Sequence, residues 1–193
     1  MLRGLTVHQD ERLHPDCLRY LAGYSEKVLD QVRELVAQGR LGEVLSRRYP
    51  AAHVIRTDRA LYDFTLGLKN QYLRSSSPLG KVLYDTRITA ERQALGLHSY
   101  QGLVQGARIR TRNEIRIASL FKSAPLEFLR MIVVHELAHL KEREHNKAFY
   151  QLCEHMEPDY YQLEFDVRLY LTLLEQGETL YGPAGPETTP ASG

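Results

Sequence analysis

The stretch from Met131 to His145 constrains this chain more than any other. It reads MIVVHELAHLKEREH and contains an H-E-x-x-H motif that begins at His135 and ends at His139. On an α-helix, residues four apart lie about one turn apart on the same face, so these two histidine rings can reach one ion. Two histidines at this spacing, with Glu136 beside them, are typical of zinc hydrolases in which the glutamate is the general base.

The flanks of the motif are apolar, and they comprise Met131, Ile132, Val133, Val134, Leu137, Ala138 and Leu140. A helix that is apolar on most sides is buried. Two histidines and a carboxylate on a buried helix cost stability unless a partner satisfies them. The alternative, a surface helix with a chance His/Glu pair, does not explain these flanks. The sequence therefore predicts a metal site inside the fold.

A third metal ligand is predicted at His145, ten residues after the first. A straight helix would place it about 15 Å along the axis from His135, so the helix must end near Lys141 to Arg143 and the chain must double back. No Gly or Pro marks this break, but Asn146 can cap a new helix. On spacing alone, the alternatives to His145 are Glu142, Glu144 and His155.

The segment HELAHLKEREHNKAFYQLCEHMEP resembles the YgjP-like metallopeptidase family, which is related to the SprT and WLM zincins. The resemblance extends over most of the chain, through YLAGYSEKVLDQVRELV, RYPAAH, LKNQYLRSSSPLGKVLYD, ALGLHSYQGLVQGARIRTRNEIRIASLFK and YYQLEFDVRLYL. It implies zinc (Zn²⁺) ligands at His135, His139 and His145, with Glu136 as the base and Phe149 as the aromatic residue that follows the third ligand. The resemblance indicates a hydrolase without indicating its substrate.

Composition sets the broad limits. A chain of 193 residues with 43% hydrophobic and 25% charged residues is expected to form one globular domain. A formal net charge of +1 makes no general case for an anionic membrane, and it disfavours nucleic acid as a partner. Two cysteines do not form a disulfide framework, and no run resembles a signal peptide or a membrane span. These features predict a soluble cytoplasmic protein without a membrane partner.

The order of patterns along the chain predicts an α+β, zincin-like fold, with N-terminal helices, a small twisted sheet packed on the H-E-x-x-H helix, and C-terminal helices. We expect a flexible arm over 1–16, a single domain over 17–178, and a disordered tail over 179–193. Within the domain, 17–78 is predicted to be helical, and 79–178 is predicted to carry the sheet and the metal helices.

Individual elements follow from periodicity and capping signals. Helices are expected over 18–38 (broken or paired), 41–48, 58–73, 147–156 and 159–176, and strands over 81–85, 96–104, 106–112 and 114–118. Thr57 or Asp58 is expected to cap the third helix, on which Lys69 belongs to a solvated face. Ser123 is expected to cap the motif helix, with Pro125 in its first turn.

Five cations cluster within fifteen residues: Arg108, Arg110, Arg112, Arg116 and Lys122. We favour a solvated face of the sheet for this cluster, because a charge run alone is weak support for a site. The alternative is an anion site that holds a substrate phosphate or a nucleic-acid backbone. His155 and Tyr160 are candidate donors to a developing oxyanion, although packing is the favoured role for both.

Three functions compete. The first is a zinc metallopeptidase acting on a peptide or protein, in which the metal activates a water and Glu136 is the general base. The second is a metal-dependent pyrophosphohydrolase of nucleoside triphosphates such as UTP, in which the arginine cluster neutralises phosphate. The third is a non-catalytic interaction module stabilised by zinc, for which Glu136 would have no use.

Overall fold

The computed structural model of the protein describes residues 18–88, 96–105 and 108–181, with the backbone alone for 96–105 and 108–112. The predicted arm and most of the predicted tail lie outside these residues. The elements in chain order are η1 (Arg19–Leu21), α1 (Glu26–Ala37), α2 (Leu41–Arg48), α3 (Asp58–Tyr72), β1 (Leu79–Asp85), β2 (Gly96–Gln105), β3 (Arg108–Ala118), η3 (Ser119–Ser123), α4 (Leu126–Ala138), α5 (Lys147–Met156) and α6 (Tyr160–Glu175). This mixture of helices and a small sheet confirms the predicted α+β class.

The N-terminal helices begin and end where local chemistry predicts. Gly39 follows α1 with a φ of 64°, a left-handed conformation that glycine adopts without a Cβ penalty. The Oγ1 atom of Thr57 accepts the backbone N–H of Ala60 at 3.2 Å and so caps α3. Helix α2 has the predicted bounds, and the predicted break within 18–38 separates η1 from α1.

The prediction that Lys69 is solvated is wrong. Its side chain is buried, with 5% of its surface exposed. The Nζ atom donates to the carbonyl oxygens of Leu73 at 3.5 Å and of Ser76 at 3.4 Å, just beyond the C-terminal end of α3. A helix C-terminus leaves carbonyl groups without helical partners and favours a cation, so the ammonium group finds its partners inside the fold.

The sheet has three strands in the order β1-β3-β2, with the central β3 parallel to β1 and antiparallel to β2. The two strands predicted over 106–112 and 114–118 are one strand, β3. Gly102 lies within β2 and pairs with Thr111, although a glycine is unfavourable inside a strand. Continuous pairing with a neighbouring strand overrides the local glycine signal.

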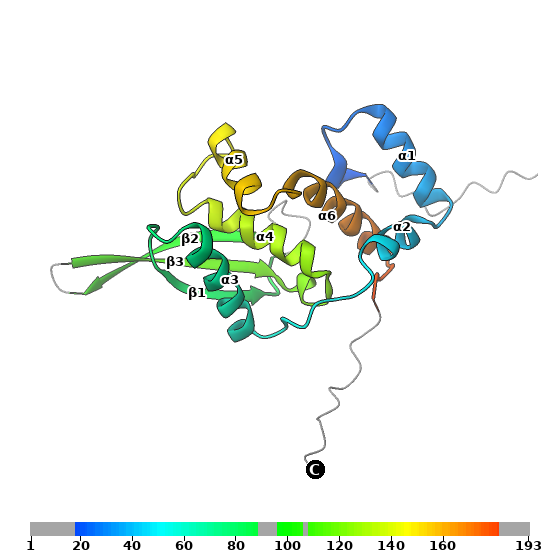
Figure 1. Ribbon diagram of the computed structural model, residues 1–193. Coiled ribbons are helices and arrows are strands. Elements are labelled where there is room, and N and C mark those ends of the chain that lie inside the picture. Colours follow the sequence, from blue (N-terminus) through cyan, green and yellow to red (C-terminus); the bar gives the residue numbers. More distant parts are fainter. Residues whose placement is uncertain (1–17, 89–95, 106–107, 182–193) are drawn as a thin grey trace, which may run out of the picture.

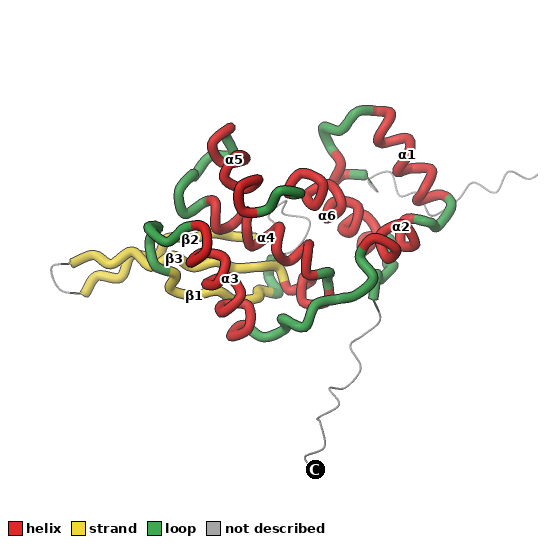
Figure 2. Tube along the Cα trace, in the orientation of Figure 1, coloured by secondary structure: helices red, strands yellow, loops and turns green. Residues whose placement is uncertain are grey.

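Helices α3 and α4 cover one face of the sheet (Figure 1). Val82, Ile115 and Ile117 are buried, as the two-residue period of a strand requires for the face beneath the helices. Helix α6 packs against α4, and α2 and η1 pack against α6. Figure 2 shows the result: the strands gather in one layer, and α1, α2 and α6 lie beyond α4.

Helix α4 carries the motif and is buried at nine of its thirteen residues. The predicted cap at Ser123 is wrong, because Ser123 ends η3 and Pro125 occupies the N-cap position of α4. The N–H of Ala124 donates to the carbonyl of Phe121 at 3.2 Å, so the 3-10 turn continues to this point and α4 begins two residues later than a serine cap requires. The predicted burial of the motif helix is confirmed.

Candidate active site

Helix α4 brings the first two histidines together at its C-terminal end. His135 lies in the last turn, His139 is the C-cap residue, and their ring centroids are 5.1 Å apart. The apolar residues around them fix this end of the helix in the core, so both rings are held by a rigid support. His135 and His139 are half-buried.

The chain doubles back immediately after α4. The N–H groups of Lys141 and Glu142 both donate to the carbonyl of Ala138 at 3.0 Å, which closes a tight turn. The Oδ1 atom of Asn146 then accepts the N–H of Phe149 at 2.9 Å and caps α5, as the sequence predicts. The helix ends a few residues earlier than predicted, and no glycine is used.

This turn places His145 beside the other two histidines. Its Nε2 atom lies 3.2 Å from Nε2 of His135 and 3.1 Å from Nε2 of His139. Among the described residues, these three side chains form the group of possible metal ligands, with ligand atoms all within 4.8 Å of one another. Glu142, Glu144 and His155, the alternatives to His145, do not belong to it.

The two separations from Nε2 of His145 fit a tetrahedral metal ion. Zinc binds imidazole nitrogen at about 2.0–2.1 Å, so two ligands of a tetrahedral site are about 3.3 Å apart. The separations of His145 from His135 and His139 are close to this value. Lone pairs of neutral imidazoles that face one another repel, and a cation between them removes that repulsion.

Hydrogen bonds behind two of the rings orient them. Nδ1 of His139 donates to the backbone carbonyl of Glu142 at 3.0 Å. Because a carbonyl can only accept, the proton resides on Nδ1 and leaves the Nε2 lone pair free for a metal. Nδ1 of His135 lies 2.7 Å from the hydroxyl of Tyr160. Tyr160 is fully buried.

Burial keeps His135 and His139 neutral. Desolvation, reinforced by the neighbouring His139 and His145, lowers the pKa of His135 to about 3. Burial is also the main reason that the pKa of His139 is below its ordinary value. Metal binding requires the neutral imidazole, so both rings are ready to bind at neutral pH.

Glu136 carries a buried carboxyl group, one oxygen of which has no hydrogen-bond partner among the described residues. Its side chain is 3% exposed, and that oxygen is Oε2. Burial raises its pKa to about 8. Such a group is costly for stability, and its position next to His135 is where a hydrolase requires a group that accepts and returns a proton.

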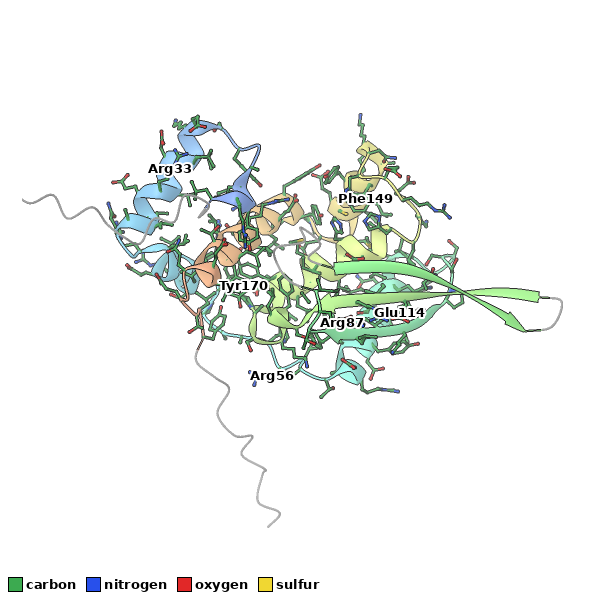
Figure 3. The ribbon with its side chains drawn as sticks, turned by 180° about the vertical axis from the view of Figure 1, so that it is seen from behind. Arg33, Arg56, Arg87, Glu114, Phe149 and Tyr170 are labelled. Carbon is green, nitrogen blue, oxygen red and sulfur yellow. The ribbon has the colours of Figure 1, made fainter. Side chains whose placement is uncertain are left out.

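Phe149 forms the apolar wall of the site. Its ring centroid lies 5.0 Å from that of His135 and 4.7 Å from those of His139 and His145. Figure 3 labels it on α5, beside the end of α4. A fully buried aromatic ring against all three imidazoles restricts their rotation and keeps water from one side of the triad.

The two candidate oxyanion donors occupy different surroundings. The hydroxyl of Tyr160 is engaged by Nδ1 of His135 and therefore lies behind a ligand ring. His155 is exposed on α5, where its ring packs edge-to-face on Tyr72 at 5.6 Å. The contacts of Tyr160 indicate a positioning role, and those of His155 a surface packing role.

The arginine cluster is described in part. Arg116 pairs with Asp85 at 2.8 Å and with Glu114, so its charge is already balanced. The neighbouring Arg87 and Arg116 hold the pKa of Asp85 well below its usual range. The side chains of Arg108, Arg110 and Arg112 lie outside the description, although their backbone belongs to β3. These three stay candidate anion contacts.

The comparisons with known proteins agree with this class of site. A family model described as "YgjP-like, metallopeptidase domain" matches residues 106–166, which include Glu136 and all three histidines. The chain is also 58% identical over 161 residues to a UTP pyrophosphatase of Escherichia coli (strain K12), covering 83% of this chain and 96% of that protein. No solved structure matches the chain.

Family and relative together indicate a metal-dependent hydrolase. At this identity and coverage, the chain belongs to the YgjP-like metallopeptidase family. Within the described ranges, every helix is too short or too polar to cross a bilayer.

Proposed function

We propose that the protein is a zinc-dependent hydrolase that cleaves nucleoside triphosphates, UTP first among them, and releases pyrophosphate. The chemistry is supported by the three converging histidines beside a buried, unpaired glutamate. The substrate is supported by the similar UTP pyrophosphatase, 96% of which aligns with this chain. The sequence favoured a peptide substrate, and this relative is the reason for placing the nucleotide ahead of it.

Each residue of the site has a proposed role. His135, His139 and His145 would hold the metal, with Nε2 as the ligand atom of each. A zinc ion held there supplies a Lewis acid that brings the pKa of a coordinated water to about 7. Glu136 accepts the proton of the attacking water and transfers it to the leaving group. We also propose that the fold is zincin-like, with the motif helix packed on a small sheet.

The overall reaction adds one water across the anhydride between the α- and β-phosphates of UTP. A new P–O bond forms to the water oxygen, the bridging P–O bond breaks, and UMP and pyrophosphate result. Glu136 is next to His135 on α4, where its carboxylate can accept the proton and hold it between these two events. Any proton that the products release at neutral pH passes to the solvent.

The test is hydrolysis of UTP by the zinc-loaded protein, followed by the release of UMP and pyrophosphate. We expect activity that is lost on treatment with a chelator, restored by zinc and abolished in Glu136→Gln. A zinc-loaded, folded protein that leaves UTP and other nucleoside triphosphates intact would overturn the proposal.

Arg110 and Arg112 are the proposed phosphate contacts, on the strength of the sequence pattern. Replacing both by glutamine is expected to raise KM for UTP and to make the activity less sensitive to salt, since fewer cations meet the phosphates. An unchanged KM would assign these arginines to the solvated face of the sheet.

Peptide hydrolysis is the second candidate function. It is favoured by the H-E-x-x-H motif itself and by the metallopeptidase domain that gives the family model its description. Cleavage of unfolded protein or peptide libraries by the zinc-loaded protein, lost in Glu136→Gln and accompanied by no nucleotide hydrolysis, would establish it in place of the first.

A non-catalytic zinc module is the weakest alternative. Structural zinc sites are usually closed by four protein ligands, whereas three histidines converge among the described residues. A structural site also has no use for a buried glutamate without a partner, which costs stability.

A further inference from the structure

Two tyrosines form an aligned pair of rings between α5 and α6. Tyr150 and Tyr161 have ring centroids 5.6 Å apart and planes inclined by 26°, a stacked arrangement. Tyr161 is 50% exposed, which makes it one of the few large apolar side chains on the described surface. One side of its ring rests on Tyr150, and half of its surface is open to solvent.

The pair lies next to the histidine triad. The ring centroid of Tyr150 is 6.4 Å from that of His145, the exposed member of the triad. Phe149, the preceding residue on α5, packs against all three histidine rings. Two ring-to-ring steps therefore connect the exposed face of Tyr161 to a candidate metal ligand, a separation that a nucleotide can span.

A single exposed apolar residue requires no special explanation. Here, however, the exposed ring is held flat by a second ring, and the pair borders the site instead of lying elsewhere on the surface. Aromatic rings held in place at a solvent-exposed edge are the surfaces on which proteins stack nucleobases, because every base has a π-face.

We propose that Tyr161, supported by Tyr150, stacks on the nucleobase of the substrate while the triad holds its phosphates. This inference rests on the proposed nucleotide substrate. It assigns a binding site to the nucleobase, the end of the nucleotide that the metal does not contact. Tyr161 is then a binding residue of the enzyme, and Tyr150 is the residue that positions it.

The charges around the pair agree with this orientation of the nucleotide. The carboxylates of Glu154 and Glu164 both help to raise the pKa of Tyr161, after desolvation as the main cause. Acidic groups near the rings repel phosphate and direct it away from them. Glu164 accepts a hydrogen bond from Arg168 at 2.7 Å, whereas Glu154 is exposed, and its carboxylate is the one assigned to accept an N–H of the base.

The experiment uses the full-length, zinc-loaded protein and the variants Tyr161→Ala and Tyr161→Phe. We measure kcat and KM for UTP, and the binding of UMP and of inorganic pyrophosphate by calorimetry. Loss of one stacked base is expected to raise KM for UTP and Kd for UMP about tenfold to a hundredfold. Pyrophosphate has no base, so its Kd is expected to stay at the wild-type value, and Tyr161→Phe, which keeps the ring, is expected to behave as wild type.

Val54→Ala is the matched control, because Val54 is another exposed apolar residue, at 89% exposure, and lies in the loop before α3. It is expected to leave all constants unchanged. Equal losses of UMP and pyrophosphate affinity in Tyr161→Ala would indicate damage to the metal site and overturn the stacking role, as would an unchanged KM and Kd.

The two proposals can fail separately. If wild-type protein binds UMP through Tyr161 but does not hydrolyse UTP, the proposed function fails and the base site stands. If UTP is hydrolysed with the same KM in Tyr161→Ala, the function stands and the base site fails. A protein that neither binds UMP nor hydrolyses UTP, or that cleaves peptides in a Tyr161-dependent manner, overturns the nucleobase assignment.

Discussion

The hydroxyl of Tyr160, on α6, lies 2.7 Å from Nδ1 of His135, on α4. This contact joins two of the helices that surround the site. Groups that hold the far nitrogen of a metal-binding histidine fix both its tautomer and its orientation. Tyr160 is therefore suited to positioning His135 for the metal.

Removal of this hydroxyl tests the relationship. Tyr160→Phe keeps the buried ring but leaves Nδ1 of His135 without its partner, and we expect zinc affinity to fall about tenfold to a hundredfold. Competition with a chromophoric chelator measures it. Tyr170→Phe is the control, since Tyr170 is a buried tyrosine on the same helix whose ring packs against Phe128. Equal zinc affinity in the two variants would remove the positioning role.

The ligand set is tested by comparing histidines that differ in placement. His145→Ala is expected to reduce bound zinc as severely as His139→Ala, because each removes one of three converging Nε2 atoms. His155→Ala is expected to keep the wild-type zinc content, since His155 is exposed and packs on Tyr72. Measurement of the zinc content of each purified variant tests both expectations. Full zinc content in His145→Ala would mean that the third ligand lies elsewhere.

Local signals predicted the helical framework of the site because they act within a few residues. A four-residue spacing places His135 and His139 on one face, and the apolar flanks predict the burial of α4. Asn146 marks the start of α5 through an N-cap that the structure confirms. The position of the turn between the two helices was predicted less well, because α4 ends at Ala138 and not near Lys141 to Arg143.

Other features depend on contacts between distant parts of the chain, so no local pattern announces them. Lys69 is buried because carbonyls beyond α3 accept its protons, although its neighbours in the sequence suggest a solvated face. β3 is continuous because β2 pairs with it throughout. The link from His135 to Tyr160 joins residues 25 apart in sequence, and only packing of α6 on α4 creates it.

Glu136→Gln separates proton transfer from metal binding. The amide keeps the size of the side chain but cannot accept a proton at neutral pH, so turnover of UTP is expected to fall at least about a hundredfold. Zinc content and thermal stability are expected to stay near wild type, because Glu136 is outside the triad and its Oε2 has no partner among the described residues. Undiminished turnover would require a different base.

His53 provides a pH-dependent contribution to stability that is independent of the metal. It lies in the loop between α2 and α3, where Nδ1 accepts the N–H of Ile55 at 3.0 Å and Nε2 lies 2.7 Å from the carbonyl of Phe121. Nε2 must therefore carry the proton and Nδ1 must not, so the folded state requires a neutral ring. Desolvation lowers the pKa of His53 below its ordinary value.

The sign of the effect follows from this lowered pKa. Below the unfolded value of about 6.5, the unfolded chain binds a proton at this position that the folded protein excludes, so stability falls as the pH falls from there toward the folded pKa. His53→Gln can still donate to the Phe121 carbonyl but does not titrate. It is expected to be less stable than wild type by about 1–3 kcal/mol at neutral pH, because a buried hydrogen bond is disturbed.

The two proteins are then expected to approach each other in stability between about pH 7.5 and about pH 5.5, since wild type alone loses the contribution of His53. Urea unfolding in the presence of a chelator measures the difference, and the chelator makes the titration of His135 and His139 common to both proteins. A difference that stays constant or widens on acidification would show that a protonated His53 is accommodated in the fold.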